Sequence, residues 1–345
     1  MASRDTMPLM SEYPVTLGVE EEVFILEKGR LTPTLQSLDY LRKLYWSNPR
    51  RYMTHSASNF SKGTDRKQCF MGSVEIATGK HTSPLSLVDD LKHRRTAFAK
   101  AAQHALVVPV GALFSISSPS NTASSHVHVG VPRSERDRVY QNLAYFTPVL
   151  ALAAANSPWA EGKPFGSSYR MSQKGLLGPL QTDCEYRFQD VIISKRLGTI
   201  ELRIFDPIPE LDRLQAILST VKTIAAHPGE FPFDRETYNR ERLDWTQHGF
   251  TPYVRTLFER LNELDSFEET WIDCPLGKTL GEFAKKNGIR AAYEEADKIW
   301  RKPTGTTAKP KPYSVAKTAA GLAGYYAVRL PFMAYKGYKE WYGKS

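Results

Sequence analysis

Alternating hydrophobic and polar positions predict a series of short strands in the first part of the chain. Within residues 13–27, apolar and polar residues alternate from Val15 to Val19, and the apolar run VFIL follows. The same pattern predicts further strands at residues 73–78, 106–113, 126–131, 191–194 and 199–206. The last two flank the sequence RLG, which is typical of a tight turn, so we expect them to pair antiparallel.

Other apolar residues recur at the spacing of helices. Leu35, Leu38 and Leu41 lie on one face of a predicted helix at residues 35–45. Polar, glycine-containing residues 156–173 predict a loop. Further helices are predicted at residues 84–106, 135–155, 211–226 and 250–263. Strands interleaved with long helices, without regular βαβ alternation, predict an α+β fold with a largely antiparallel sheet and helices on one face.

The composition excludes several classes of protein. The chain has 345 residues, of which 41% are hydrophobic, with 22 glycines and 22 prolines, so a full core is available and collagen-like repeats are excluded. No apolar run approaches the roughly 18 residues that a membrane helix needs. Three widely spaced cysteines without a CxxC pair argue against a zinc ribbon or a disulfide framework. We therefore expect a cytoplasmic protein with reduced thiols.

Basic residues are concentrated near the C-terminus. The chain has 46 Lys and Arg against 37 Asp and Glu, a net charge of +9. Residues 301–345 mix lysines with many aromatic side chains, and a disordered tail rarely holds so many. We expect residues 314–342 to be ordered and packed on the body or on a sister subunit, and residues 301–312 to be a mobile loop. We interpret the charge as a solvated surface, with attraction of ATP or an acidic acceptor as the alternative.

Acidic side chains interrupt three of the predicted strands, and two of these are considered first. In the sequence GVEEE, Glu20 and Glu22 point to one side of the strand and Glu21 to the other. Two neighbouring carboxylates on a largely buried strand are costly unless a cation compensates their charge. Hard divalent metals prefer such oxygen ligands, whereas a solvated edge strand is the alternative interpretation. Glu75 is a further acid within an apolar strand.

Imidazole and guanidinium groups follow the same alternation. His126 and His128 share one face of their strand, and valines occupy the other face. Glu201 and Arg203 likewise share a face, either as a structural ion pair or as a metal ligand beside a phosphate-binding arginine. Four strands thus direct polar groups to one face. This arrangement indicates a curved sheet with a polar, metal-loaded concave side and helices on its convex side, suited to Mg-nucleotide chemistry.

Five motifs appear in the order GVEEE, VEIAT, HVHVG, NSPWAEGKPFGSSYR and TIELRIFD, and together they resemble the type 2 glutamate–cysteine ligase family of carboxylate–amine ligases. The resemblance spans roughly residues 15–226. It implies a glutamine-synthetase-like catalytic domain at residues 13–300, followed by a basic, aromatic extension at residues 301–345 packed on the body. It also implies dependence on ATP and Mg²⁺ or Mn²⁺. In such ligases a carboxylate is phosphorylated to an acyl phosphate, from which an amine then displaces phosphate.

The resemblance also implies roles for individual residues. His128 is expected near the nucleotide phosphates, Arg203 on the phosphates, and Arg170 on ATP or the substrate carboxylate, so that both arginines are catalytic. Asn156 and Trp159 are expected to shape the pocket floor. The implied metal ligands are Glu20, Glu22, Glu75, His126 and Glu201.

Two features depart from the family pattern. Relatives usually carry CGxHVHVG, whereas Ala123, Ser124 and Ser125 precede the histidines here. Relatives often have another acid shortly before VEIAT, whereas the nearest acid here is Asp65.

From these motifs we expect an ATP-dependent ligase that joins glutamate or a similar amino acid to an amine such as cysteine. The expected substrates are amino acids or small peptides, with an acidic acceptor as a further candidate partner. We also expect a homo-oligomer and no association with membranes. The alternatives are a phosphotransferase on the same fold, acting on a carboxylate or guanidinium, and a non-catalytic regulatory homologue. Nucleic-acid binding is kept as an alternative because of the net charge alone, since no RNP, helix-turn-helix or zinc-finger motif is present.

Overall fold

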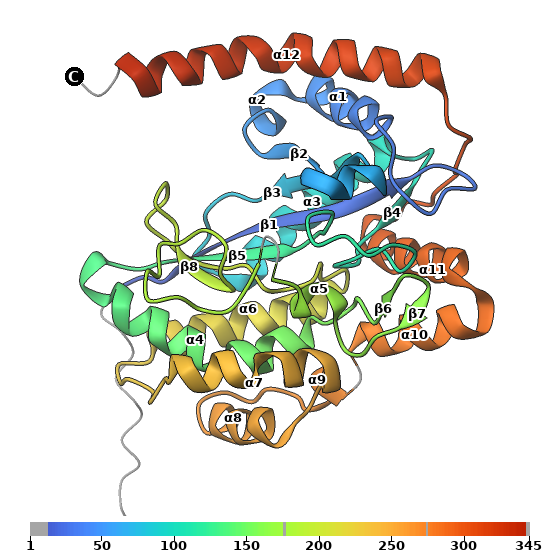
Figure 1. The fold of residues 1–345 in the computed structure, drawn as a ribbon. Coiled ribbons are helices and arrows are strands. Elements are labelled where there is room, and N and C mark those ends of the chain that lie inside the picture. The colour runs from blue at the N-terminus through green and yellow to red at the C-terminus, as the bar shows by residue number, and fades with distance from the viewer. Residues whose placement is uncertain (1–12, 175–176, 274, 343–345) are drawn as a thin grey trace, which may run out of the picture.

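A seven-stranded sheet forms the centre of the molecule (Figure 1). The computed structural model describes residues 13–174, 177–273 and 275–342. The strand order is β2-β3-β1-β5-β9-β8, and β4 pairs with the end of β1. The strand pairings within this sheet are all antiparallel among the described residues, which confirms the predicted α+β class and the pairing of β8 with β9. The strands are β1 (Thr16–Leu26), β2 (Ser56–Phe60), β3 (Met71–Ala77), β4 (Leu106–Val108), β5 (Ser125–Gly130), β8 (Val191–Ile193) and β9 (Ile200–Leu202), with a separate hairpin of β6 (Trp159–Ala160) and β7 (Lys163–Pro164).

Helices surround this sheet, and those predicted at residues 35–45, 135–155, 211–226 and 250–263 lie close to their predicted positions. The helices at residues 235–248, 276–287, 289–301 and 315–342 were not predicted as helices. Figure 1 shows α4, α6, α7 and α8 grouped together, with α1, α2 and α12 on the opposite side of the molecule. The helices are α1 (Ser37–Ser47), α2 (Pro49–Tyr52), α3 (Pro84–Ala101), α4 (Arg136–Ala153), α5 (Tyr169–Ser172), α6 (Leu211–Ala226), α7 (Arg235–His248), α8 (Pro252–Asn262), α9 (Thr270–Asp273), α10 (Leu276–Asn287), α11 (Ile289–Arg301) and α12 (Val315–Tyr342). Short 3₁₀ turns are η1 (Gly63–Lys67), η2 (Arg133–Glu135) and η3 (Lys302–Thr304).

The alternation along β1 divides its residues between two cores. Val19 and Val23 belong to the main core, which also includes side chains from α3, α4 and α6. Phe24 and Leu26, on the other face, belong to a second core with residues of α10 and α11. Helices were predicted on one face of the sheet only. They therefore also cover part of the other face, around Phe24 and Leu26. Glu20 precedes this covered stretch and remains partly accessible.

Glu21 faces the helical side of the sheet and anchors it. Its carboxylate and the Arg95 guanidinium on α3 are both fully buried and form an ion pair, with Arg95 Nε donating to Oε2 at 3.0 Å. Trp300 Nε1 on α11 donates to the same oxygen at 3.2 Å. The middle acid of GVEEE is thus a structural residue that ties two helices to β1.

Several predicted boundaries were wrong. The strand predicted at residues 199–206 comprises only Ile200–Leu202. The helix predicted at residues 84–106 ends at Ala101, because Leu106 pairs instead with Leu26 of β1. The strand predicted at residues 106–113 ends at Val108, since the next residue, Pro109, has no N–H to continue the ladder.

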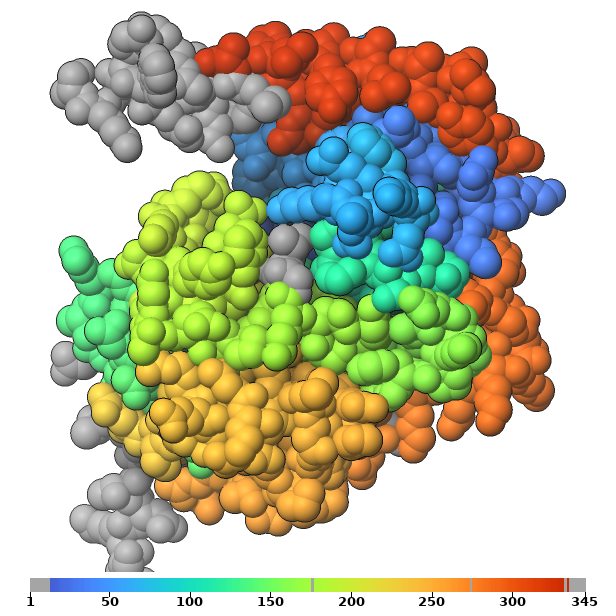
Figure 2. All heavy atoms as spheres, in the orientation of Figure 1, coloured from blue at the N-terminus to red at the C-terminus, as the bar shows by residue number. Residues whose placement is uncertain are grey.

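The segment before α12, residues 301–312, was predicted to be a mobile loop, but it begins with the end of α11 and the turn η3 and is then hydrogen-bonded to the body. Lys309 N donates to Gln103 O at 2.7 Å, and Lys311 N donates to His104 O at 2.9 Å. The following helix, α12, packs along the N-terminal segment that contains α1 (Figure 2). Within the described part of the chain, no helix has both the length and the apolar character needed to cross a membrane.

Candidate active site

Cross-strand register brings the predicted metal ligands of four strands onto one face of the sheet. Residues directly opposite one another in antiparallel strands point to the same face. The opposed pairs are Glu22–Glu75, Glu20–His126 and His128–Glu201. The convergence follows from the register of β1, β3, β5 and β9.

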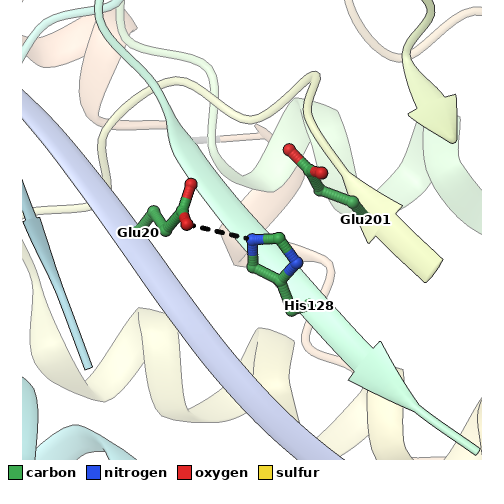
Figure 3. A group of neighbouring side chains, drawn as sticks. All are labelled: Glu20, His128 and Glu201. Carbon is green, nitrogen blue, oxygen red and sulfur yellow. Dashed lines mark ion pairs between the residues drawn. The ribbon is translucent and has the colours of Figure 1, made fainter. Parts of the chain in front are cut away.

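Glu20 lies at the centre of this cluster. His126 Nδ1 is 3.5 Å from Glu20 Oε2 and also 3.5 Å from Glu201 Oε1. His128 Nε2 is 3.6 Å from Glu20 Oε1, the pair marked in Figure 3. Ligand atoms of Glu20, His128 and Glu201 all lie within 4.8 Å of one another. Both imidazoles therefore reach the same carboxylate, although the resemblance implies different roles for them.

The donor set fits a hard divalent cation. His126 Nδ1 and His128 Nε2 are buried, and neither has a hydrogen-bond partner among the described residues. Each nitrogen faces a carboxylate oxygen instead. A cation between them would give both the nitrogen and the oxygen a binding partner. Because carboxylate oxygens outnumber imidazole nitrogens in the wider cluster, the set suits Mg²⁺ or Mn²⁺ better than zinc.

Two residues that the sequence analysis missed hold Glu22 in place. Asn59 Nδ2 on β2 donates to Glu22 Oε1 at 2.8 Å, and Ser124 Oγ donates to Oε2 at 2.6 Å. Ser124 Oγ also lies 2.8 Å from His126 Nε2. Ser124 stands two residues before His126, so the alternation of the strand could have indicated it. Asn59 has no comparable signal in the sequence.

Glu75 lies in an environment that disfavours its charged form. Burial raises its pKa to about 8, and the neighbouring charges of Glu20 and Glu22 act in the same direction. A nearby cation would favour the charged carboxylate again. The carboxylate of Asp65, the nearest acid before VEIAT, accepts hydrogen bonds from the backbone N and the Oγ of Ser120, at 2.8 and 2.6 Å.

The two predicted catalytic arginines are placed differently. Arg203 forms an ion pair with Glu201 at the edge of the cluster. Arg170 is buried, and its guanidinium donates to Ile204 O at 2.6 Å and to Arg203 O at 2.9 Å. Arg170 thus holds the backbone that carries Arg203, while its Nε has no hydrogen-bond partner among the described groups.

The motif NSPW…SYR forms a buried polar network around Asp206. Asp206 Oδ2 accepts hydrogen bonds from Asn156 N at 2.8 Å and from Ser157 Oγ at 2.7 Å. The Asn156 side chain is bonded to the backbone of Pro109 and Gly111. Asn156 therefore supports the loop instead of presenting its amide to a ligand.

Trp159 stacks on Phe114, with ring centroids 6.5 Å apart. Neither Trp159 nor Asn156 lines the two cavities described next, so the structure does not place them at a pocket floor.

Two cavities adjoin the cluster, one at each end. The first, of about 560 Å³, is lined by Glu20 and His128 together with Leu17, Lys80 and Leu197. The second, of about 420 Å³, is more polar. It is lined by Glu22, Asn59 and His126 and by the cationic side chains of Lys62, Arg66, Arg170, Arg187 and Arg203. Since Gly18 is opposite His128 and Glu20 is opposite His126, the cluster lies between the two cavities along β1.

Two curated proteins are similar to this chain in sequence. The chain is 26% identical over 242 residues to "Putative glutamate--cysteine ligase 2" of Ectopseudomonas mendocina (strain ymp), covering 63% of this chain and 58% of that protein. It is 29% identical over 177 residues to "Putative glutamate--cysteine ligase 2-1" of Nocardioides sp. (strain ATCC BAA-499 / JS614), covering 44% and 45% respectively. The chain thus spans about half the length of these curated relatives. No family model matches the chain.

A solved structure shares the fold. The glutamate–cysteine ligase of Francisella tularensis, in complex with AMP, superposes with a TM-score of 0.56 at 9% identity, covering 94% of this chain and 95% of that one. The fold likeness and the curated relatives confirm the resemblance that the motifs indicated.

Proposed function

We propose that the protein is an ATP- and divalent-metal-dependent ligase that joins the carboxylate of glutamate, or of a similar amino acid, to an amine such as cysteine. The observation that carries this proposal is the convergence of acids and imidazoles from β1, β3, β5 and β9 on one face, between two cavities. The curated relatives and the shared fold support the same class of reaction.

The cavities suggest how the substrates are arranged. The first cavity has apolar walls and a lysine, Lys80, which suits a nucleoside with its phosphates directed toward His128. The second carries arginines and lysines, which suit an anionic amino acid. The reacting carboxylate and the γ-phosphate would then meet at the cluster between the cavities.

The chain's own residues would bind and orient the reactants. Glu20, Glu22, Glu75, His126 and Glu201 would hold the metal, which supplies positive charge against the phosphate oxygens. Arg203 adds a fixed guanidinium at the edge of the cluster, kept in place by Arg170.

The proposed reaction proceeds in two steps. The substrate carboxylate displaces ADP from the γ-phosphorus to give an acyl phosphate. The amine then attacks the acyl carbon, phosphate leaves, and the amine loses a proton. Preorganised charge of this kind stabilises transition states in phosphoryl transfer.

The test is to incubate the protein with ATP, Mg²⁺ and pooled amino acids and to analyse the products by mass spectrometry. A condensed product with the mass of two amino acids less water supports the ligase. A stable phosphorylated compound without condensation would identify the phosphotransferase instead, and no ATP-dependent product would contradict both.

A cytoplasmic location, an acidic acceptor and a homo-oligomeric state remain parts of the proposal. Cys69 and Cys184 are free thiols, as a reducing compartment would maintain them. The division into a catalytic domain at residues 13–300 and an extension at residues 301–345 is likewise a proposal.

A further inference from the structure

Helix α12 is built into the body of the protein through a close contact with α1. A Cβ atom added at Gly321 would lie 2.6 Å from Asp39 N, and one added at Gly324 would lie 2.2 Å from Arg42 Cδ. Gly321 therefore allows the two helix backbones to approach closely, and Gly324 leaves room for the Arg42 side chain. On the same side of α12, Tyr325 is only 3% exposed and stacks on Tyr45, with ring centroids 5.8 Å apart. A helix that served only solubility would not need these contacts.

Two side chains of α12 reach past α1 to strand β2. The hydroxyls of Tyr325 and Ser58 are 2.6 Å apart. One turn later, Arg329 Nη1 donates to Ser56 O at 3.1 Å and to Tyr45 Oη at 2.8 Å. Because β2 is the edge strand of the sheet and pairs with β3 alone among the strands described, these bonds support it from outside the sheet.

Strand β2 in turn forms part of the candidate active site. Ala57 lies opposite Glu75 on β3. Next to Ser58, Asn59 donates its Nδ2 to Glu22 Oε1 at 2.8 Å and to Ser73 Oγ at 3.1 Å. Ser58 and Asn59 also line the second cavity. The position of β2 therefore decides where the Asn59 amide meets Glu22.

We propose that Tyr325 and Arg329 are positioning residues for the metal cluster: they hold β2 so that Asn59 orients the Glu22 carboxylate toward the cation. This inference rests on the proposed function, because it assumes that Glu22 is a metal ligand. It assigns to the C-terminal helix, which lies outside the five sequence motifs, a role in the chemistry of the site. Outer partners that orient metal ligands typically change metal affinity by about 10–100-fold when removed.

The experiment measures Mn²⁺ binding directly, by titration followed with electron paramagnetic resonance, without ATP or amino acids. The variants are Tyr325→Phe, which keeps the ring and removes the hydroxyl, and Ser58→Ala, which removes the same bond from the strand side. Tyr326→Phe is the matched control, because Tyr326 is the neighbouring tyrosine and is 38% exposed. Arg329→Gln tests the second contact, and thermal melting of each preparation reports stability.

We expect Tyr325→Phe and Ser58→Ala each to weaken Mn²⁺ binding about 10-fold, and the double variant to be no weaker than either single one. Arg329→Gln should also weaken binding, and Tyr326→Phe should bind as the wild type does. Unchanged Mn²⁺ affinity in Tyr325→Phe and Ser58→Ala, with or without a lower melting temperature, would overturn the inference. If the wild type forms the amide product while these variants bind Mn²⁺ normally, only the inference fails. If the wild type neither binds Mn²⁺ nor forms a product, the proposed function fails with it.

Discussion

Neighbouring glutamates on β1 should respond in opposite ways to the same substitution. Glu21→Gln removes the charge that compensates Arg95 in a fully buried ion pair. Glu20→Gln makes the same chemical change one residue away, on the face that carries the candidate metal cluster. The first variant should lose stability, and the second should lose activity while remaining folded.

The magnitudes follow from the contacts of each side chain. Breaking a buried ion pair by removing one partner costs about 3–5 kcal/mol. We take about 3 kcal/mol for Glu21→Gln, since the glutamine oxygen can still accept from Arg95 Nε or Trp300 Nε1. At about 2 °C per kcal/mol for a large domain, the melting temperature should fall by about 6 °C. Glu20 has no comparable partner, its nearest imidazole nitrogen being 3.5 Å away, so Glu20→Gln should change stability by less than about 1 kcal/mol.

Two assays on the same preparations separate these effects. Denaturant unfolding followed by circular dichroism gives the free energy of unfolding, and mass spectrometry of the amide product gives turnover. Glu21→Gln should unfold earlier but keep turnover within about 10-fold, whereas Glu20→Gln should lose about 100-fold or more. A Glu21→Gln variant as stable as the wild type, or a Glu20→Gln variant destabilised as much as Glu21→Gln, would contradict the separate roles of the two glutamates.

Three further outcomes are expected. Chelation should abolish activity, and Mg²⁺ or Mn²⁺ should restore it; a zinc ion retained through dialysis and required for turnover would contradict the hard-cation assignment. Glu201→Gln should lower turnover by orders of magnitude with an unchanged fold by circular dichroism, and wild-type turnover would return Glu201 to a structural role. Asp90→Asn should lower the free energy of unfolding at pH 7 by about 1–2 kcal/mol, and the loss should shrink as the pH falls below 3.8; a pH-independent loss would contradict the ion-pair explanation.

The sign of the Asp90 effect follows from its surroundings. Burial alone would raise the pKa of Asp90, but hydrogen bonds from Arg94 and from the backbone N of Gly79 outweigh it and lower the pKa. A carboxyl group whose pKa is lower in the folded state contributes its full stability above the unfolded pKa. That contribution is lost as the pH falls through the folded-state value.

Strand alternation was sufficient to predict which side chains share a face. It separated Glu20 from Glu21, and the structure confirms this separation: the first lies beside the histidines and the second is buried against Arg95. Alternation does not reveal which strands are neighbours, so the register of β1 with β5 came only from the structure.

Other parts of the site depend on contacts that sequence patterns do not record. In the sequence, nothing distinguishes Asn59 from other polar residues. Its contact with Glu22 depends on the pairing of β2 with β3, which only the structure shows. Arg170 was expected to bind a ligand, but backbone carbonyl groups at residues 203–205 occupy much of its guanidinium. The helix α3 ends earlier than the sequence pattern predicted, because residues 106–108 form a strand that pairs with β1.

The central claim is that this face of the sheet activates a carboxylate by phosphorylation before an amine replaces the phosphate. Pooled amino acids carrying ¹⁸O in their carboxylates, incubated with the protein, Mg²⁺ and ATP, test this claim directly through the mass of the released phosphate. Each inorganic phosphate released with the amide should carry one ¹⁸O from the substrate. Amide formation accompanied by unlabelled phosphate, or by label in AMP, would contradict it.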